Sequence, residues 1–253
     1  MPRASRDILS EPPPAAADVR IAYGPEPLQF GDLRLPVADS PHPLLVVVHG
    51  GYWKAIHNLI HAGHMCVALA AEGIATWNVE YRRVGDVGGG WPGTAEDVGN
   101  AVGFVAELVR RFPLDPDRVA LLGHSAGGHL ALLAARQARL RAVLPVAAAA
   151  DVLAVSRRGG GDGAADAFLG GSPEEVPDRF AAASPRLPLG VPQVLIHGVE
   201  DDVVPVEDSV RWVEAAGDEA RLVALEGAGH FEPIDPQARE WPLVAAEIHA
   251  VLR

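Results

Sequence analysis

The motif Gly123-x-Ser125-x-Gly127 constrains the fold of this chain more than any other feature. Residues 117–122 before it are short and largely apolar, as expected for a buried strand, and residues 129–136 after it are strong helix formers. A motif of this form between a strand and a helix makes a tight turn that holds the serine in a strained backbone conformation. Its glycines leave room for neighbouring backbone that a Cβ atom would contact. We therefore predict that Ser125 lies at a helix N-terminus, where the dipole favours developing negative charge.

Strand-like and helix-like segments alternate along most of the chain. Expected strands occupy residues 19–23, 28–35, 44–49, 74–79, 118–122, 142–147, 192–197 and 220–225, and expected helices occupy residues 57–72, 94–112, 126–139, 206–216 and 236–252. The strongly apolar run 44–49 is typical of a central parallel strand that is buried on both faces. This alternation predicts one α/β domain over residues 1–253, with a mostly parallel central sheet and helices on both faces. In such sheets, ligands bind at the carboxyl ends of the strands.

Three segments need separate interpretation. Residues 151–190 contain three consecutive glycines, several prolines and only short helical pieces, at 162–169 and 173–183. An insertion of this kind after a central strand is typical of a small cap or a flexible lid, although a disordered linker has a similar composition. Residues 1–17 are interpreted as a loose N-terminal arm. The spacing of Thr94 and Asp97 is that of a capping box, which predicts the start of the helix over 94–112.

Composition restricts the partners and the cellular location. The net charge is −12, with 33 acidic and 21 basic residues, which argues against nucleic acid or an anionic membrane as partner. The single cysteine, Cys66, permits no internal disulfide, so we expect a cytoplasmic protein. We see neither a secretory signal in residues 1–20 nor the roughly 18–20 apolar residues of a membrane span. The charge suits a neutral or cationic small molecule as substrate, and the sequence does not indicate the oligomeric state.

A serine hydroxyl becomes a nucleophile when a base accepts its proton and a carboxylate orients that base. On a sheet of the expected kind, the chain order is serine, then acid, then histidine. Asp201 and Asp202 follow the strand 192–197, and His230 follows the strand 220–225 in a glycine-flanked loop. We therefore predict Ser125 as nucleophile and His230 as base, and either aspartate satisfies the required order.

The developing negative charge on a carbonyl oxygen also needs backbone N–H donors. We expect Ala126, directly after the nucleophile, to supply one donor, and Gly51 and Tyr52 in the loop after the strand 44–49 to supply the others. Trp53 and Trp91 are predicted to bind substrate as aromatic walls, although aromatic side chains near a pocket are also ordinary core residues.

The remaining histidines and the cysteine are interpreted as structural. His49 is expected to fix the loop that follows it, and His124, His129 and His197 to pack or form hydrogen bonds. His57, His61 and His64 have helical spacing, but no acidic or cysteine partner accompanies them as in a zinc site. Cys66 has no base beside it and is expected to be a buried, inert thiol. We therefore expect neither a metal nor a cofactor.

These motifs together resemble the α/β-hydrolase superfamily, and the similarity covers nearly the whole chain. Residues 49–53 (His-Gly-Gly-Tyr-Trp), 123–127 (Gly-His-Ser-Ala-Gly) and 129–131 (His-Leu-Ala) are similar to the kynurenine formamidase (arylformamidase) branch, near the hormone-sensitive-lipase-like esterases. Those esterases usually carry a third glycine where this chain has Tyr52. Residues 197–205 resemble the acid loop of prolyl-oligopeptidase-like and thioesterase-like members, and this resemblance implies that Asp201 is the acid.

The function predicted from these observations is a serine hydrolase that cleaves a small ester or amide through an acyl-enzyme, of the arylesterase or arylformamidase type. Two alternatives use the same fold without hydrolysis. A receptor-like binding protein usually lacks a member of the triad, and none is missing here. A lyase or cyclase would use the same pocket for a different reaction.

Overall fold

The central element is one sheet of eight strands. The computed structural model describes residues 5–37 and 41–253. The strand order is β1-β2-β4-β3-β5-β6-β7-β8. The strands are β1 (Val19–Ala22), β2 (Phe30–Arg34), β3 (His42–Val48), β4 (Ala75–Val79), β5 (Leu114–His124), β6 (Val143–Val146), β7 (Gln193–Gly198) and β8 (Ala220–Leu225). The first two strands form an antiparallel hairpin that pairs with β4, and all other pairs are parallel. The prediction of a mostly parallel sheet is thus confirmed.

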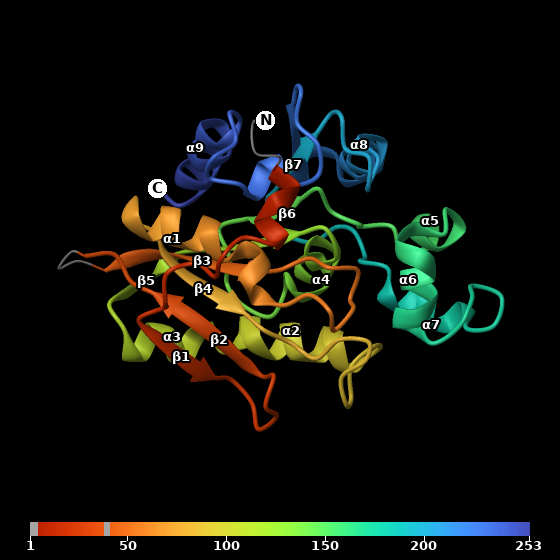
Figure 1. Cartoon of the computed structure of the whole chain (residues 1–253), viewed down its shortest axis with the longest axis horizontal. Helices are drawn as coiled ribbons and strands as arrows, with labels where there is room; N and C mark the ends of the chain where they lie inside the picture. Colours follow the sequence, from red (N-terminus) through yellow and green to blue (C-terminus); the bar gives the residue numbers. More distant parts are fainter. Residues whose placement is uncertain (1–4, 38–40) are drawn as a thin grey trace.

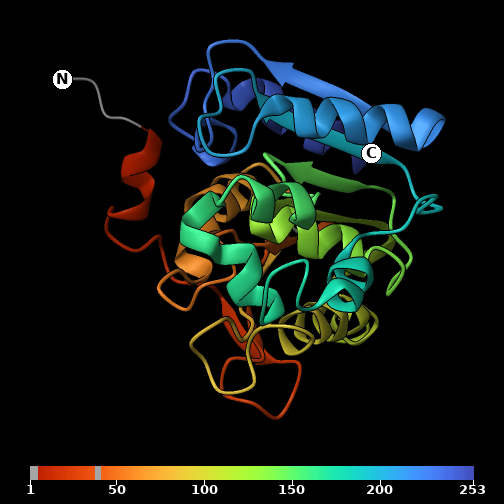
Figure 2. The same cartoon turned by 90° about the vertical axis from the view of Figure 1, so that its right-hand side faces the viewer.

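Helices cover both faces of this sheet (Figure 1). Helices α1 (Gly63–Ala71) and α9 (Trp241–Val251) lie on one face, and α2 (Gly93–Gly103), α3 (Val105–Arg111), α4 (Ala126–Ala134) and α8 (Val206–Ala216) lie on the other. A further group, α5 (Val152–Arg157), α6 (Gly160–Leu169) and α7 (Pro177–Ala183), is inserted between β6 and β7. In the view from the side of the molecule that carries α5–α7, these inserted helices lie in front of the sheet (Figure 2).

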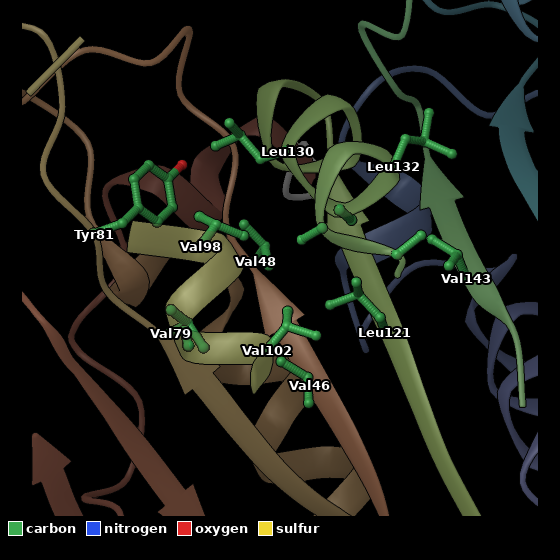
Figure 3. Close-up of a cluster of buried hydrophobic side chains, with 14 of the residues drawn as sticks. Val46, Val48, Val79, Tyr81, Val98, Val102, Leu121, Leu130, Leu132 and Val143 are labelled. Carbon is green, nitrogen blue, oxygen red and sulfur yellow. The ribbon is translucent and has the colours of Figure 1, made fainter. Parts of the chain in front are cut away.

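The alternation of side chains along β3 explains why a continuous apolar run forms the centre of the sheet. Val46 and Val48 pack into the cluster that contains Val98 and Val102 of α2 (Figure 3), whereas Val47 packs against the layer formed by α1 and α9. Because successive side chains of a strand point to opposite faces, both faces of β3 are buried. Each such valine side chain stabilises the fold by about 1.5–3 kcal/mol.

Several element boundaries differ from the sequence predictions. The helix expected over 57–72 begins as a short 3₁₀ helix, η2 (Leu59–Ala62), and α1 starts only at Gly63, because the Asn58 side chain caps the preceding turn at Ile60 N–H. The helix expected over 94–112 is divided into α2 and α3 around Phe104, after Gly103, a residue of low helix propensity. The loose arm expected over 1–17 contains a 3₁₀ helix, η1 (Ser5–Leu9); residues 1–4 lie outside the described residues.

The capping box expected at Thr94 and Asp97 is wrong. Pro92 occupies the position before α2, and no side chain caps the helix there. Thr94 Oγ1 instead donates to the carbonyl oxygen of Arg82 at 2.5 Å, and the Asp97 carboxylate accepts from Arg82 Nε at 2.8 Å. Both side chains are buried, and through Arg82 and Gly90 they hold the glycine-rich loop over residues 85–93 that leads into the helix.

The insertion over residues 151–190 is a packed layer and not a disordered linker. Phe168 of α6 is fully buried, and Ala183 of α7 accepts a hydrogen bond from His129 Nε2 at 2.7 Å. An ion pair between Arg158, which follows α5, and Asp208 of α8 joins the insertion to the main layer at 2.6 Å. These contacts come from three different elements, so the inserted helices are attached along their length.

Candidate active site

Ser125 lies on a strained turn between β5 and α4, as the sequence predicts. Its backbone has φ 54° and ψ −120°, in the positive-φ region that non-glycine residues rarely occupy, and its N–H donates to Val146 O at 2.8 Å. A Cβ atom on Gly123 would lie 2.1 Å from the carbonyl oxygen of Gly127, and one on Gly127 would lie 2.2 Å from that of Val48. Both glycines are therefore required by close backbone contacts.

The structure joins His230 to Asp201 and leaves Asp202 outside this pair. His230 Nδ1 donates to Asp201 Oδ2 at 2.7 Å, and Asp201 Oδ1 accepts from the N–H groups of Val203 and Val204, each at 2.8 Å. The Asp201 side chain is fully buried, whereas that of Asp202 is 71% exposed. Geometry therefore distinguishes two aspartates that are adjacent in sequence.

Two histidines determine the charge state of Asp201. Burial opposes ionisation, but hydrogen bonds from His197 and His230 outweigh it and hold the pKa of the Asp201 carboxyl well below its usual range. His197 Nε2 lies 3.1 Å from Asp201 Oδ2 and 2.9 Å from Val204 O, and its Nδ1 lies 2.7 Å from Ser209 Oγ. His197 is thus a buried hydrogen-bonding residue, as expected, and it also contacts the carboxylate.

The loop that carries His230 packs directly against the turn that carries Ser125. His124, the residue before Ser125, donates from Nε2 to the backbone oxygen of His230 at 2.9 Å. The two imidazole rings are also in contact, with their centroids 4.7 Å apart. The loops after β7 and β8, which carry Asp201 and His230, thus lie against His124, the residue before Ser125.

The loop after β3 passes close to the serine. A Cβ atom on Gly50 would lie 3.0 Å from Ser125 Cβ, and the backbone of Tyr52 has a positive φ of 54°. The ring nitrogens of His49 lie 2.7 Å from Gly50 O and 3.0 Å from Glu80 Oε1, so His49 fixes this loop as expected. The absence of a side chain on Gly50 and the positive φ of Tyr52 therefore allow the loop to pass close to Ser125.

Three backbone N–H groups at the site have no backbone acceptor in the described part of the chain. Within residues 5–37 and 41–253, no backbone oxygen accepts a hydrogen bond from the N–H of Gly51, Tyr52 or Ala126. These are the three groups that the sequence predicts as donors to a carbonyl oxygen. Unpaired N–H groups near a nucleophile are available to a ligand at no cost to the fold.

The two tryptophans do not form an exposed aromatic wall. Trp53 is only 1% exposed because its ring stacks on Phe168 at 5.0 Å and meets the His129 ring edge-on. Trp91 borders a groove of about 480 Å³ together with Leu133, in the second half of α4, whereas Ser125 precedes the first residue of that helix. Tyr52 is the half-buried aromatic residue of the loop beside Ser125.

Contacts with Tyr52 and Asp202 identify neighbours of the site that sequence reasoning missed. The Tyr52 ring abuts Gly161 of α6, where a Cβ atom would lie 2.3 Å from Tyr52 Cδ1. Arg6 from the N-terminal arm lies 3.3 Å from Asp202 Oδ1 and 5.8 Å from the centre of the Phe231 ring. In each of these contacts the two partners are more than one hundred positions apart in the sequence, so no local sequence signal could have indicated them.

The structure also places the remaining candidate groups. The rings of His57 and His61 meet edge-on with their centroids 6.4 Å apart, and His61 also bonds to His124. His64 lies 3.2 Å from Pro12 O, so the three histidines do not converge on one point. No group of three metal-ligating side chains occurs within the described part of the chain. Cys66 is buried, and burial raises the pKa of its thiol to about 12.

Among the described residues, we find no helix with the length and apolar character needed to span a membrane.

Comparison with known proteins agrees with this architecture. Residues 32–215 match the BD-FAE family. The chain is similar to Esterase LipC of Mycobacterium tuberculosis, with 30% identity over 91% of this chain and 65% of LipC. It is also similar to the isoprenylcysteine alpha-carbonyl methylesterase ICME of Arabidopsis thaliana, with 26% identity over 84% of this chain and 56% of that protein. The chain thus spans less than two thirds of the length of these relatives.

Solved structures share the fold at low sequence identity. A truncated carbohydrate esterase from gut microbiota aligns with a TM-score of 0.77 and 20% identity, covering 94% of this chain and 97% of that one. The propionate-bound esterase Est2 of Thermogutta terrifontis aligns with a TM-score of 0.73 and 20% identity, covering 92% and 93%. Together with the match over residues 32–215, these similarities show that the chain belongs to the BD-FAE family within the α/β-hydrolase superfamily.

Proposed function

We propose that the protein is a serine hydrolase that cleaves a small ester through an acyl-enzyme. The observation that carries the proposal is the 2.7 Å hydrogen bond between His230 and Asp201, on a loop packed against the strained turn of Ser125. The 30% identity to a protein named Esterase LipC supports ester hydrolysis as the reaction. In this proposal Ser125 is the nucleophile, His230 the general base and Asp201 the orienting acid.

The hydrogen bond to Asp201 determines which nitrogen of His230 acts. Because Nδ1 carries the proton that it donates to Asp201, Nε2 presents a lone pair that can accept the Ser125 hydroxyl proton. Ser125 Oγ then attacks the ester carbonyl carbon, and the free N–H groups of Gly51, Tyr52 and Ala126 stabilise the oxyanion. His230 next protonates the leaving alcohol, and a water molecule, deprotonated by His230, hydrolyses the acyl-enzyme and regenerates Ser125.

In this proposal the inserted helices α5–α7 form a cap beside the site. Gly161 of α6 contacts the ring of Tyr52, and Lys54 Nζ donates to the Gly161 carbonyl oxygen at 2.7 Å. Phe168 stacks on Trp53, so the cap packs on the same loop that supplies two N–H donors. Movement of the cap would therefore change the position of the donors.

The finer proposal concerns the leaving group, which we take to be aromatic, as an aryl ester or an aryl formamide. Its support is Tyr52, whose half-buried ring belongs to the loop beside Ser125 and can stack on a flat group. A comparison of kcat/KM for phenyl acetate and N-formylkynurenine tests it. A preference of about 10²-fold for the formamide identifies a formamidase, and a preference for the acetate identifies an arylesterase. Activity restricted to long-chain esters or lactones contradicts both.

The nucleophile is tested by replacing the serine. We expect a fluorophosphonate probe to label the wild-type protein at Ser125, and Ser125→Ala to lose both labelling and several orders of magnitude in ester turnover. Ser156→Ala is a matched control, because the Ser156 hydroxyl donates to Asp166 within the insertion, at 2.5 Å. A folded wild-type protein that the probe does not label favours a receptor-like binder. Labelling without hydrolysis of any ester favours a lyase or cyclase.

A further inference from the structure

Three buried histidines connect parts of the site that are far apart in sequence. His61 on η2 lies with Nε2 2.8 Å from Nδ1 of His124, which is the last residue of β5. His124 Nε2 lies 2.9 Å from the backbone oxygen of His230, in the loop after β8. The mechanism proposed above uses only His230 of these three residues, so the roles of the other two need a separate explanation.

Hydrogen-bond chemistry determines the direction of both bonds. A carbonyl oxygen only accepts, so His124 must carry its proton on Nε2 and present a lone pair on Nδ1. His61 must then donate from Nε2, which leaves its own Nδ1 as a buried acceptor without a partner among the described residues. A buried acceptor without a partner lowers the stability of the fold, so packing alone does not explain why a histidine occupies this position.

Both rings remain neutral in this arrangement. Burial, together with the nearby His230, lowers the pKa of His124 to about 3. Burial and the neighbouring His124 hold the pKa of His61 well below its usual range. Neither ring therefore gains the second proton that would reverse a hydrogen bond, and the direction of the chain persists near neutral pH.

We propose that His61 and His124 are positioning residues, which hold the main chain of His230 so that its Nε2 faces Ser125. This inference rests on the proposed function, because it requires His230 to be the general base. His124 directly precedes Ser125, so a single ring links the turn of the nucleophile to the backbone of the base. A Cβ atom on Gly50 would lie 2.9 Å from His124 Nδ1, so the same ring also borders the loop of the N–H donors.

The loss of His61 leaves His124 free to exchange tautomers and to release the carbonyl of His230. We expect His61→Phe to lower kcat by about 10–100-fold with KM nearly unchanged, since a misplacement of about 1 Å can cost 10²-fold. His61→Gln, whose side-chain amide can donate to His124 Nδ1, should recover most of kcat. His64→Phe is the matched control, because His64 lies on the neighbouring α1 and bonds to the arm, and it should retain wild-type kcat.

A wild-type kcat in His61→Phe overturns the inference, as does a kcat in His61→Gln as low as that of His61→Phe. ¹⁵N NMR of the histidine rings provides a readout that does not depend on activity. We expect wild-type His124 to be protonated at Nε2 only, and the His230 ring signals to shift in His61→Phe but not in His64→Phe. Protonation of His124 at Nδ1, or unchanged His230 signals, overturns the inference even if the protein hydrolyses no ester. Absence of hydrolysis with the expected ring signals contradicts only the proposed function.

Discussion

At the residue scale, Asp201 and Asp202 show how strongly environment separates two identical side chains. Asp201 accepts hydrogen bonds from His230 and from two backbone N–H groups while its side chain is fully buried. Asp202 forms an exposed ion pair with Arg6 at 3.3 Å, and such pairs contribute about 0–1 kcal/mol at most. The buried carboxylate can orient a histidine, because water does not compete for its hydrogen bonds.

This difference predicts unequal effects of two conservative substitutions. We expect Asp201→Asn to lower kcat by about 10³–10⁴-fold, because the amide favours the wrong tautomer of His230. Asp202→Asn should change kcat less than about threefold, since an exposed pair is largely screened. Steady-state kinetics on one ester compares the two variants. The reverse ranking would assign the acid role to Asp202.

Asp201 should also contribute to the pH dependence of stability. Its folded pKa lies below the ordinary value of about 3.9, so its contribution is fully present above roughly pH 5 and is lost as pH falls toward the folded pKa. The free energy of unfolding of the wild type should therefore fall below about pH 4 more steeply than that of Asp201→Asn, by up to about 1.4 kcal/mol per pH unit. Urea unfolding between pH 2 and 6 measures both slopes. Parallel curves would contradict the assignment.

At the element scale, the junction between β5 and α4 depends on close backbone contacts. Gly127 lies in α4, and a Cβ atom there would be 2.2 Å from Val48 O and 2.4 Å from His49 O. Both acceptors belong to the backbone of the central strand and its loop, so they cannot move aside as a flexible side chain would. The turn that strains Ser125 is thus stabilised by direct contact between a helix and the sheet.

We predict opposite effects for alanine at two helical glycines. Gly127→Ala should destabilise the protein by about 3 kcal/mol, the upper part of the usual range for overpacking. Gly99→Ala in α2 should stabilise it by about 0.5–1 kcal/mol, because its Cβ would meet Gln137 Cγ at 3.8 Å, an ordinary van der Waals distance. Urea unfolding measures both differences. Equal stability of Gly127→Ala and the wild type would show that the backbone contact is not close in solution.

At the scale of the whole molecule, the site lies between two peripheral structures. The inserted helices α5–α7 pack on the loop of Tyr52 from one side. The N-terminal arm runs along the outside of the molecule (Figure 2), where Arg6 reaches Asp202 and Phe231. Ile8 is 1% exposed and anchors this arm, whereas the adjacent Leu9 is 39% exposed.

The arm should therefore detach locally when its anchor is shortened. We expect Ile8→Ala to speed amide hydrogen exchange over residues 5–9 while the melting temperature changes little, because a terminal segment can open without unfolding the sheet. Leu9→Ala is the matched control and should leave exchange in the arm unchanged. If both variants exchange alike, Ile8 does not anchor the arm.

Local patterns determined much of this protein. The alternation of apolar residues predicted the sheet and its covering helices, and the glycines around Ser125 predicted the strained turn. The order of the polar loops predicted a serine, then Asp201 or Asp202, then His230 along the chain. These features follow from periodicity and from the conformational limits of single residues, which act over a few positions. Element ends were less predictable: the cap at Asn58 places a 3₁₀ turn before α1, and the helix expected over 94–112 is divided at Phe104.

Only the tertiary structure decided the contacts between distant segments. It joined Asp201 rather than Asp202 to His230, whereas sequence resemblance could only imply that choice. It buried Trp53 under Phe168, 115 positions away in sequence, and linked His61 to His124 through a hydrogen bond. Such contacts depend on how whole layers pack against one another. The packing therefore decides whether a tryptophan is buried in the core or lines a pocket, and which of two adjacent aspartates contacts His230. The spacing of residues within one segment does not predict that packing, because each contact joins two distant segments and neither segment's local pattern depends on the other's.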